Sequence, residues 1–265
     1  MENGKMKKIY LIPDINNLEK TMELAKAYDA CFEYNDFFFP LVLDDEEEVK
    51  RRIQIYKSLD RDRSRDTLHG TFLDIVIHSQ DEKIRKVSEQ RVRQSLSIAQ
   101  DLGIRGCVFH ANLIAGYYSE LYLQGWLDAS ISFWKKMLTE YPLLEIYIEN
   151  MFENRIEDLK KLAEAMSDEP RFGICLDYAH SQLYGKDGLD WINEMAPYIR
   201  HCHINDNDLY DDRHWEVGSG KLDWDHFNER IRNNHIEPTV LIEVRDLDMW
   251  QGSAEFMKKS GIYPY

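Results

Sequence analysis

The sequence predicts a single (β/α)₈ barrel, the TIM-barrel class of α/β fold, over residues 1–265. Its length of 265 residues is close to the roughly 250 that is typical of this fold. Short runs rich in β-branched and apolar residues alternate with longer charged segments of helical periodicity, as expected of a parallel sheet built from βα units. Eight such runs occur at near-regular spacing, so one helix fits after each predicted strand.

The eight predicted strands cover residues 8–14, 30–36, 66–72, 105–111, 144–150, 172–180, 199–207 and 239–244. Three intervening helices are marked most clearly, at residues 45–59, 82–103 and 155–166, and Gly103 is the predicted C-terminal cap of the second. An open doubly wound sheet would carry a glycine-rich loop after its first strand. The corresponding segment, IPDINNLEK, contains no glycine, so the closed barrel is the preferred architecture.

Composition and charge favour a cytoplasmic protein with a small-molecule substrate. The net charge of −15 offers no global field that would attract nucleic acid or an anionic membrane. No stretch approaches the roughly 18 apolar residues of a membrane span, and the N-terminal apolar run is too short for a signal peptide. The four cysteines are widely spaced in apolar runs, where buried free thiols are common.

Side chains that bind metals recur at the C-terminal ends of the predicted strands from the third onward. They are His69, His110, Glu149, Asp177, His180, His203 and Glu243. In a closed barrel these ends meet on one face, where active sites of this fold lie. Carboxylates placed after apolar runs need a cation or a hydrogen-bond network, and mixed carboxylate and imidazole ligation suits Mn²⁺, Zn²⁺, Co²⁺ or Fe²⁺. We therefore expect a divalent metal ion as cofactor.

Seven sequence blocks carry a family resemblance. They are, in order, HGTFLDI, CVFHANL, YIEN, ICLDYAH, HCHINDND, DDRHWEVGSGKLDW and LIEVRD. Together they resemble the xylose isomerase-like TIM-barrel superfamily, which contains sugar and sugar-phosphate isomerases and epimerases and also endonuclease IV (AP endonuclease family 2). The resemblance runs from about residue 66 to the end and is weaker before that.

The resemblance implies a metal site of the ketose epimerase kind. Its ligands would be Glu149, Asp177, His203 and Glu243, and Glu149 and Glu243 would also serve as the acid/base pair. In such chemistry one carboxylate removes a carbon-bound proton, the cation stabilises the enediolate, and the other carboxylate returns a proton. The first prediction is thus a metal-dependent isomerase or epimerase of a sugar, free or phosphorylated. Relatives of this kind often form homo-oligomers.

Five further positions keep a second prediction open. His69, His110, His180, Asp212 and His214 would contact substrate in an isomerase, whereas in endonuclease IV-like members the matching positions complete a three-zinc cluster. Only five residues separate Asp206 from Asp212, which leaves little loop to enter a DNA groove, and the acidic balance also disfavours a nucleic-acid partner. A metal-dependent phosphodiesterase is the alternative, and a non-catalytic sugar-binding barrel is the third prediction.

Two neighbouring positions have a structural interpretation as well. His201 would point to the same side of its strand as His203, because strand side chains alternate with period two, and it would lie lower in the barrel. Glu33, at the end of the second predicted strand, is placed either to reach the site or to make a structural hydrogen bond.

Overall fold

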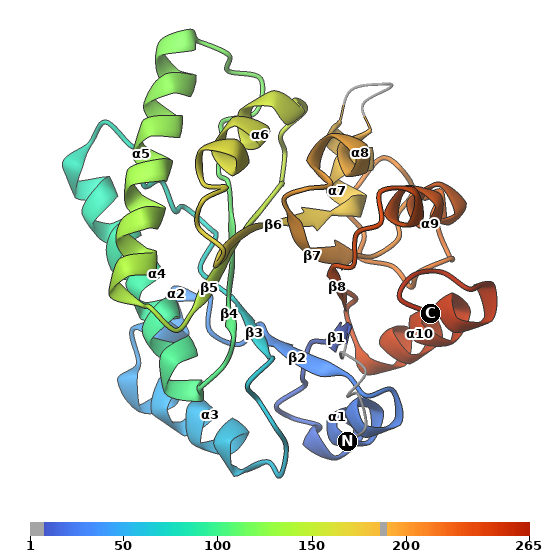
Figure 1. Ribbon diagram of the computed structural model, residues 1–265. Coiled ribbons are helices and arrows are strands. Elements are labelled where there is room, and N and C mark those ends of the chain that lie inside the picture. The colour runs from blue at the N-terminus through green and yellow to red at the C-terminus, as the bar shows by residue number, and fades with distance from the viewer. Residues whose placement is uncertain (1–7, 186–189) are drawn as a thin grey trace.

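Eight parallel strands close into a barrel in the computed structural model, which describes residues 8–185 and 190–265. Each strand pairs with its neighbours in the sequence, and β8 pairs with β1. The helices surround the strands (Figure 1). The predicted (β/α)₈ fold is therefore confirmed.

All eight predicted strands are present, each shorter than its predicted range. They are β1 (Ile9–Leu11), β2 (Cys31–Tyr34), β3 (Thr67–His69), β4 (Gly106–His110), β5 (Glu145–Glu149), β6 (Phe172–Asp177), β7 (Ile199–Ile204) and β8 (Thr239–Ile242). The residues lost from the predicted ranges lie mostly beyond the C-terminal ends, where the chain leaves the sheet to form the loops at that face of the barrel.

The helices form the outer layer of the barrel. They are α1 (Leu18–Ala27), α2 (Pro40–Leu43), α3 (Glu46–Ser58), α4 (Glu82–Leu102), α5 (Glu120–Glu140), α6 (Ile156–Ala165), α7 (Tyr178–Tyr184), α8 (Trp191–Met195), α9 (Trp224–Asn233) and α10 (Leu247–Ser260). The three helices predicted from periodicity correspond to α3, α4 and α6. Gly103 ends α4 in the left-handed conformation with φ of 70°, which glycine adopts without a steric penalty.

The sixth strand ends earlier than predicted. The apolar run was expected to continue as strand to His180, but β6 stops at Asp177 and α7 begins at Tyr178. The carboxylate of Asp177 accepts a hydrogen bond from the backbone N–H of His180 at 2.7 Å, which is the geometry of a helix N-cap. His180 therefore reaches the site from the first turn of a helix, not from the end of a strand.

A continuous apolar layer joins the helices to the outside of the barrel. Helix α4 packs on β3 and β4, α5 on β5, and α10 on β8. Leu96 and Ala99 of α4 are fully buried, and the ring of Phe109 on β4 lies 5.2 Å from that of Trp134 on α5. Burial of this kind is the main stabilising contribution to a fold, and it holds the strand ends in a fixed arrangement.

The barrel interior is filled by residues two positions before those of the site. Side chains alternate along a strand, so residue i faces inward whenever residue i+2 does. Buried clusters of Tyr10 with Cys31 and of Val108 with Tyr147 and Cys175 occupy this space. The next inward-facing residues along the strands then meet at the C-terminal face.

In the described ranges, no helix has the length and apolar character needed to traverse a lipid bilayer. The four cysteines are buried.

Candidate metal centre

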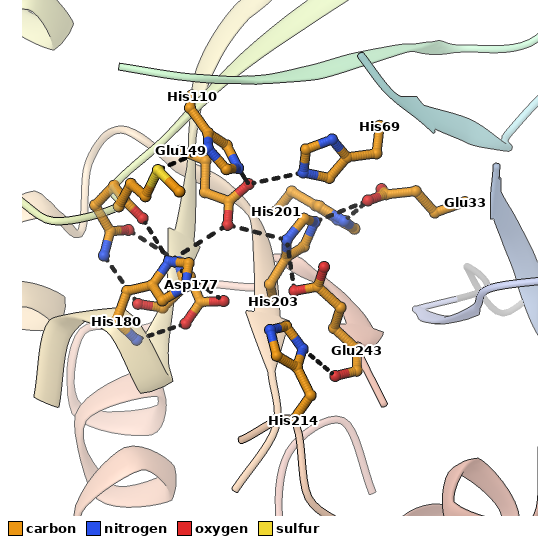
Figure 2. Close-up of polar contacts among 12 residues, drawn as sticks. Glu33, His69, His110, Glu149, Asp177, His180, His201, His203, His214 and Glu243 are labelled. Carbon is orange, nitrogen blue, oxygen red and sulfur yellow. Dashed lines mark hydrogen bonds and ion pairs between the residues drawn. The ribbon is translucent and has the colours of Figure 1, made fainter. Parts of the chain in front are cut away.

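Nine histidine and carboxylate side chains converge at the C-terminal end of the barrel, and all of them except Asp212 are labelled in Figure 2. These are the nine positions singled out in the sequence: His69, His110, Glu149, Asp177, His180, His203, Asp212, His214 and Glu243. They lie on β3 to β7, on α7, in the loop after β7 and directly after the end of β8. The register contributes directly, since it places His110 beside Glu149 and Asp177 beside His203 on neighbouring strands.

Glu149 lies at the centre of this arrangement and directs its two oxygens to different groups. Its Oε2 atom lies 3.4 Å from Nε2 of His69 and 3.2 Å from Nε2 of His110. Its Oε1 atom lies 3.3 Å from Nδ1 of His203. The carboxylate therefore links two groups of potential ligands, His69 with His110 on one side and the group around His203 on the other.

The second group contains Glu149, Asp177, His203 and Glu243, whose ligand atoms all lie within 4.8 Å of one another. Oε2 of Glu243 lies 3.3 Å from Nδ1 of His203. One oxygen of Asp177 caps α7, while Oδ2 is buried and accepts no hydrogen bond from the part of the chain that the structure describes. This oxygen is thus free to bind a cation.

A third group brings Asp212 between two histidines. Its Oδ2 atom lies 3.3 Å from Nε2 of His180 and 3.0 Å from Nε2 of His214. His214 has a φ of 49°, a left-handed conformation that a histidine adopts only at an energetic cost. Asp212 and His214 are more exposed than the other two groups, so this side of the centre faces solvent.

The second ring nitrogen of each histidine is held by an acceptor. Nδ1 of His69, His180 and His214 donates to the backbone carbonyls of Gly70, Asn150 and Glu243 at 2.9–3.0 Å. Nε2 of His203 lies 2.9 Å from a carboxylate oxygen of Glu33, and Nδ1 of His110 faces the sulfur of Met151 at 3.1 Å. Since these acceptors fix the proton on the far nitrogen, the near nitrogen of each ring directs its lone pair at the carboxylates.

These distances fit metal ligation. A neutral imidazole lone pair facing a carboxylate oxygen at 3.2–3.4 Å is repulsive unless a metal ion or a proton lies between them. Ligands bound at about 2.0–2.1 Å to one tetrahedral ion lie about 3.3 Å from one another, as follows from ordinary Zn–N and Zn–O bond lengths. The spacing and the donor types therefore both fit Zn²⁺ or a similar divalent ion.

Without a metal ion, several side chains of the centre have pKa values far from their usual ranges. Burial acts to raise the pKa of Glu149, but the charges of His203 and His110 hold that pKa well below its usual range. Burial, together with the charges of Glu149 and Glu243, raises the pKa of Asp177 to about 7, against the opposing effect of His180. Burial acts to lower the pKa of His214, yet Glu243 and Asp212 raise it to about 10. Protons thus occupy the metal-free centre in place of cations.

Three residues of the surroundings were not predicted. The amide of Asn150 accepts a hydrogen bond from the backbone N–H of Asp177 and donates to its carbonyl, each at 2.9 Å. The ring of Phe72 lies 4.7 Å from that of His110 and 5.2 Å from that of His69, and covers both. Asn150 was detectable because a polar residue directly follows Glu149, whereas nothing in the sequence indicates that Met151 supports His110.

The fold and the centre together define a (β/α)₈ barrel with a histidine and carboxylate cluster of the kind that binds divalent metal. A family profile described as xylose isomerase-like TIM barrel matches residues 20–260. The chain therefore belongs to the xylose isomerase-like TIM-barrel family, as the sequence blocks predicted.

Two curated proteins are similar to this chain in sequence. The uncharacterized protein MJ1311 of Methanocaldococcus jannaschii is 24% identical over 202 residues, which cover 72% of this chain and 68% of the relative. A probable endonuclease 4 of Protochlamydia amoebophila is 29% identical over 125 residues, which cover 40% of this chain and 44% of the relative.

Two solved structures share the fold. The TTHB071 protein from Thermus thermophilus, soaked with ZnCl₂, has a TM-score of 0.74 and 22% identity, with coverage of 95% of this chain and 97% of the other. A D-tagatose 3-epimerase-like protein has a TM-score of 0.73 and 22% identity, with coverage of 95% and 96%. At this level of identity the likeness shows the fold alone.

Proposed function

We propose that this chain is a metal-dependent phosphoester hydrolase with a centre for three divalent ions. The observation that carries the proposal is that the two carboxylate oxygens of Glu149 face different groups of residues. Oε2 faces His69 and His110, while Oε1 faces His203. A carboxylate placed in this way could hold two metal ions, one through each oxygen, and paired ions are typical of enzymes that cleave phosphate esters. This reverses the order of preference that the sequence suggested.

The group of His180, Asp212 and His214 supports a third ion. Asp212 faces both histidines through one oxygen, and its other oxygen, Oδ1, is buried without a hydrogen-bond partner among residues 8–185 and 190–265. In an isomerase that needs one ion, His180, Asp212 and His214 would contact substrate instead. When bound, divalent ions would act as Lewis acids on the phosphate ester and on the attacking water.

The residues of the centre would have distinct tasks in this reaction. Glu149 would hold two ions at a fixed separation, and Asp177, kept in place by its role as the cap of α7, would bind one of them. Asp212 and His214 lie on the more exposed side and would meet the substrate first. The surrounding carboxylates repel an anionic phosphate, so substrate binding would itself depend on the ions.

The substrate we propose is a small phosphate ester. The net charge of −15 opposes binding along a nucleic-acid backbone. Arg213, beside the centre, is paired with Asp208 and Asp211, which leaves its charge largely neutralised. The relative named as a probable endonuclease 4 is compatible with phosphoester chemistry in this family. A cytoplasmic location and assembly into homo-oligomers stay predictions.

Sugar isomerisation or epimerisation is the second candidate. Glu149, Asp177, His203 and Glu243 form the one-metal ligand set that it requires, and the structural neighbour described as D-tagatose 3-epimerase-like is compatible with it. In that reaction Glu149 binds the ion through one oxygen and moves a proton with the other. Here the second oxygen faces His69 and His110, which makes it poorly placed to act as a base on a carbon-bound proton.

The two candidates are separated by parallel assays on one zinc- or manganese-loaded preparation. The hydrolase proposal expects release of p-nitrophenol from bis(p-nitrophenyl) phosphate or p-nitrophenyl phosphate, lost on treatment with chelator and restored by metal. An abasic-site DNA duplex, tested alongside, reports whether nucleic acid is also cleaved. Deuterium incorporation from D₂O into the carbon skeleton of a ketose, without any phosphoester cleavage, would instead establish the isomerase or epimerase.

A further inference from the structure

A chain of buried polar groups lies inside the barrel, directly beneath the candidate metal centre. Its central member is Glu33 of β2, which is fully buried. Oε1 of Glu33 lies 2.9 Å from Nε2 of His203, and Oε2 lies 3.1 Å from Nε2 of His201. Figure 2 shows Glu33 on the far side of His203 from Glu149 and Glu243.

Two hydroxyl groups fix the chain at its ends. Thr67 donates to Oε2 of Glu33 at 2.6 Å, and the hydroxyl of Thr239 lies 2.6 Å from Nδ1 of His201. The ring of His201 is held between Tyr10 and Tyr147, whose ring centres lie 5.2 Å and 5.9 Å away. Each polar contact is therefore made by groups that packing already immobilises.

The contact from Glu33 determines which nitrogen of His203 faces the metal centre. The negative charge of the Glu33 carboxylate, 2.9 Å from Nε2, favours a proton on that nitrogen, so that Nδ1 keeps its lone pair toward Glu149 and Glu243. The other four histidines of the centre offer Nε2 to the carboxylates and use Nδ1 for support. His203 is turned the opposite way, and a fully buried carboxylate is the group that supports it.

We infer that Glu33 is a positioning residue that fixes His203 in the Nε2–H tautomer and thereby sets the affinity of the ion bound by Glu149, Asp177, His203 and Glu243. The inference rests on the proposed function, since it concerns the same metal centre. Partners of this kind orient a ligand imidazole and increase its basicity, and their loss commonly weakens metal binding by about 10- to 100-fold.

A substitution that keeps the size of Glu33 tests the inference. Glu33→Gln offers one acceptor oxygen in place of two, so it cannot accept from Thr67, His201 and His203 together. Calorimetric titration of the metal-free protein with Zn²⁺ should show one class of site weakened about 10- to 100-fold. In zinc-loaded protein labelled with ¹⁵N-histidine, the Nε2–H signal of His203 should shift or be lost, while the Nδ1–H signals of His69 and His214 should remain.

Matched variants separate positioning from a general loss of stability. Glu145→Gln changes a glutamate of β5 whose carboxylate is bonded to Arg105 and Tyr147, and it should leave zinc affinity and the His203 signal unchanged. Thr67→Val removes one support of Glu33 and should weaken the same class of site by about threefold or more; this variant carries the test if Glu33→Gln does not fold.

The outcomes distinguish this inference from the proposed function. Wild-type protein that binds Zn²⁺, with unchanged affinity and an unchanged His203 signal in Glu33→Gln or Thr67→Val, overturns the role of Glu33 and leaves the hydrolase proposal intact. Wild-type protein that binds no divalent ion overturns both. Weakened zinc binding with a perturbed His203 signal supports the role of Glu33 whichever reaction the centre performs.

Discussion

Nε2 of His110 lies 3.2 Å from Oε2 of Glu149, the oxygen that does not face His203. This contact distinguishes two possible roles of Glu149, that of a carboxylate between two metal ions and that of a catalytic base. An oxygen that faces His69 and His110 is poorly placed to take a proton from carbon. The same relationship makes the candidate functions experimentally distinct.

His110→Ala should remove one ion from the centre and reduce phosphoester hydrolysis by at least about 100-fold, since paired ions are needed to stabilise both the attacking and the leaving oxygen. The measurement is metal content by elemental analysis together with steady-state rates. His226→Ala, which changes a partly exposed histidine of α9, is the control and should leave both unchanged. Normal hydrolysis in His110→Ala would show that Glu149 does not act as a bridge.

Glu149→Gln should have a larger effect than loss of either histidine. The neutral amide cannot bridge two cations, so metal content should fall by two ions per chain and turnover should be abolished, by about 1,000-fold or more, while the fold persists. Circular dichroism verifies the fold and elemental analysis counts the ions. Glu145→Gln, at the other end of the same strand, should retain full metal content. Loss of only one ion from Glu149→Gln would favour the four-ligand isomerase site.

Metal affinity should fall as the pH is lowered below about 7. The pKa of Asp177 is raised to about 7 by burial and by the charges of Glu149 and Glu243, so below that pH an ion must displace its proton. Each displaced proton reduces the apparent affinity by up to about tenfold per pH unit. Zinc titrations from pH 5 to 8 measure this slope, and affinity that does not change over this range would contradict it.

The same raised pKa affects the stability of the metal-free protein. The folded state holds a proton on Asp177 that the unfolded state has lost, so this contribution to stability declines as the pH rises from about 4 through 7. Asp177→Asn keeps the helix cap and removes the ionisation. Between pH 5 and 8 the variant should therefore gain roughly 2–3 kcal/mol relative to wild type, given about 1.4 kcal/mol per pKa unit. Urea unfolding in the presence of chelator measures this difference, and a pH-independent difference would contradict the assignment.

Much of this structure could be predicted from the sequence, because hydrophobic periodicity and local signals act over short distances. Gly103 was predicted to end α4 because glycine readily adopts the left-handed conformation found there. Inward-facing polar residues likewise indicated where the strands end. The end of β6 could not be predicted in this way. The run from residue 172 to 180 is apolar enough for a strand, and only the capping bond from Asp177 to His180 shows where the helix begins.

The grouping of the nine residues into separate sets of potential ligands also depends on distances that no sequence pattern contains. The nine positions were identifiable together, but the fact that Glu149 faces His69 and His110 with one oxygen and His203 with the other arises from barrel closure. Glu33 and His201 lie 168 positions apart in the sequence. The sequence therefore left open whether Glu33 reaches the site or makes a structural hydrogen bond. These long-range relationships support the proposal of a three-metal centre over a one-metal centre.

A structural carboxylate supports the loop that carries Asp212 and His214. Asp206 is fully buried and accepts hydrogen bonds from the backbone of Asn207, Gly218 and Leu222 and from the indole of Trp224. Asp206→Ala leaves these donors unpaired and should reduce the free energy of unfolding by about 3 kcal/mol or more.

Chemical denaturation checks this prediction. Asp211→Ala, at an exposed position of the same loop, should change the free energy of unfolding by no more than about 0.5 kcal/mol. Equal effects of the two substitutions would show that Asp206 does not hold the loop.

The most direct test of the three-ion centre is the metal content of protein purified without chelator and then equilibrated with Zn²⁺ or Mn²⁺, measured by elemental analysis. The arrangement of His69 with His110, of Asp177 with His203 and Glu243, and of His180 with Asp212 and His214 predicts three ions per chain. A single ion per chain, unchanged by substitution of His110 or His214, would contradict the three-ion centre and return the isomerase or epimerase to first place.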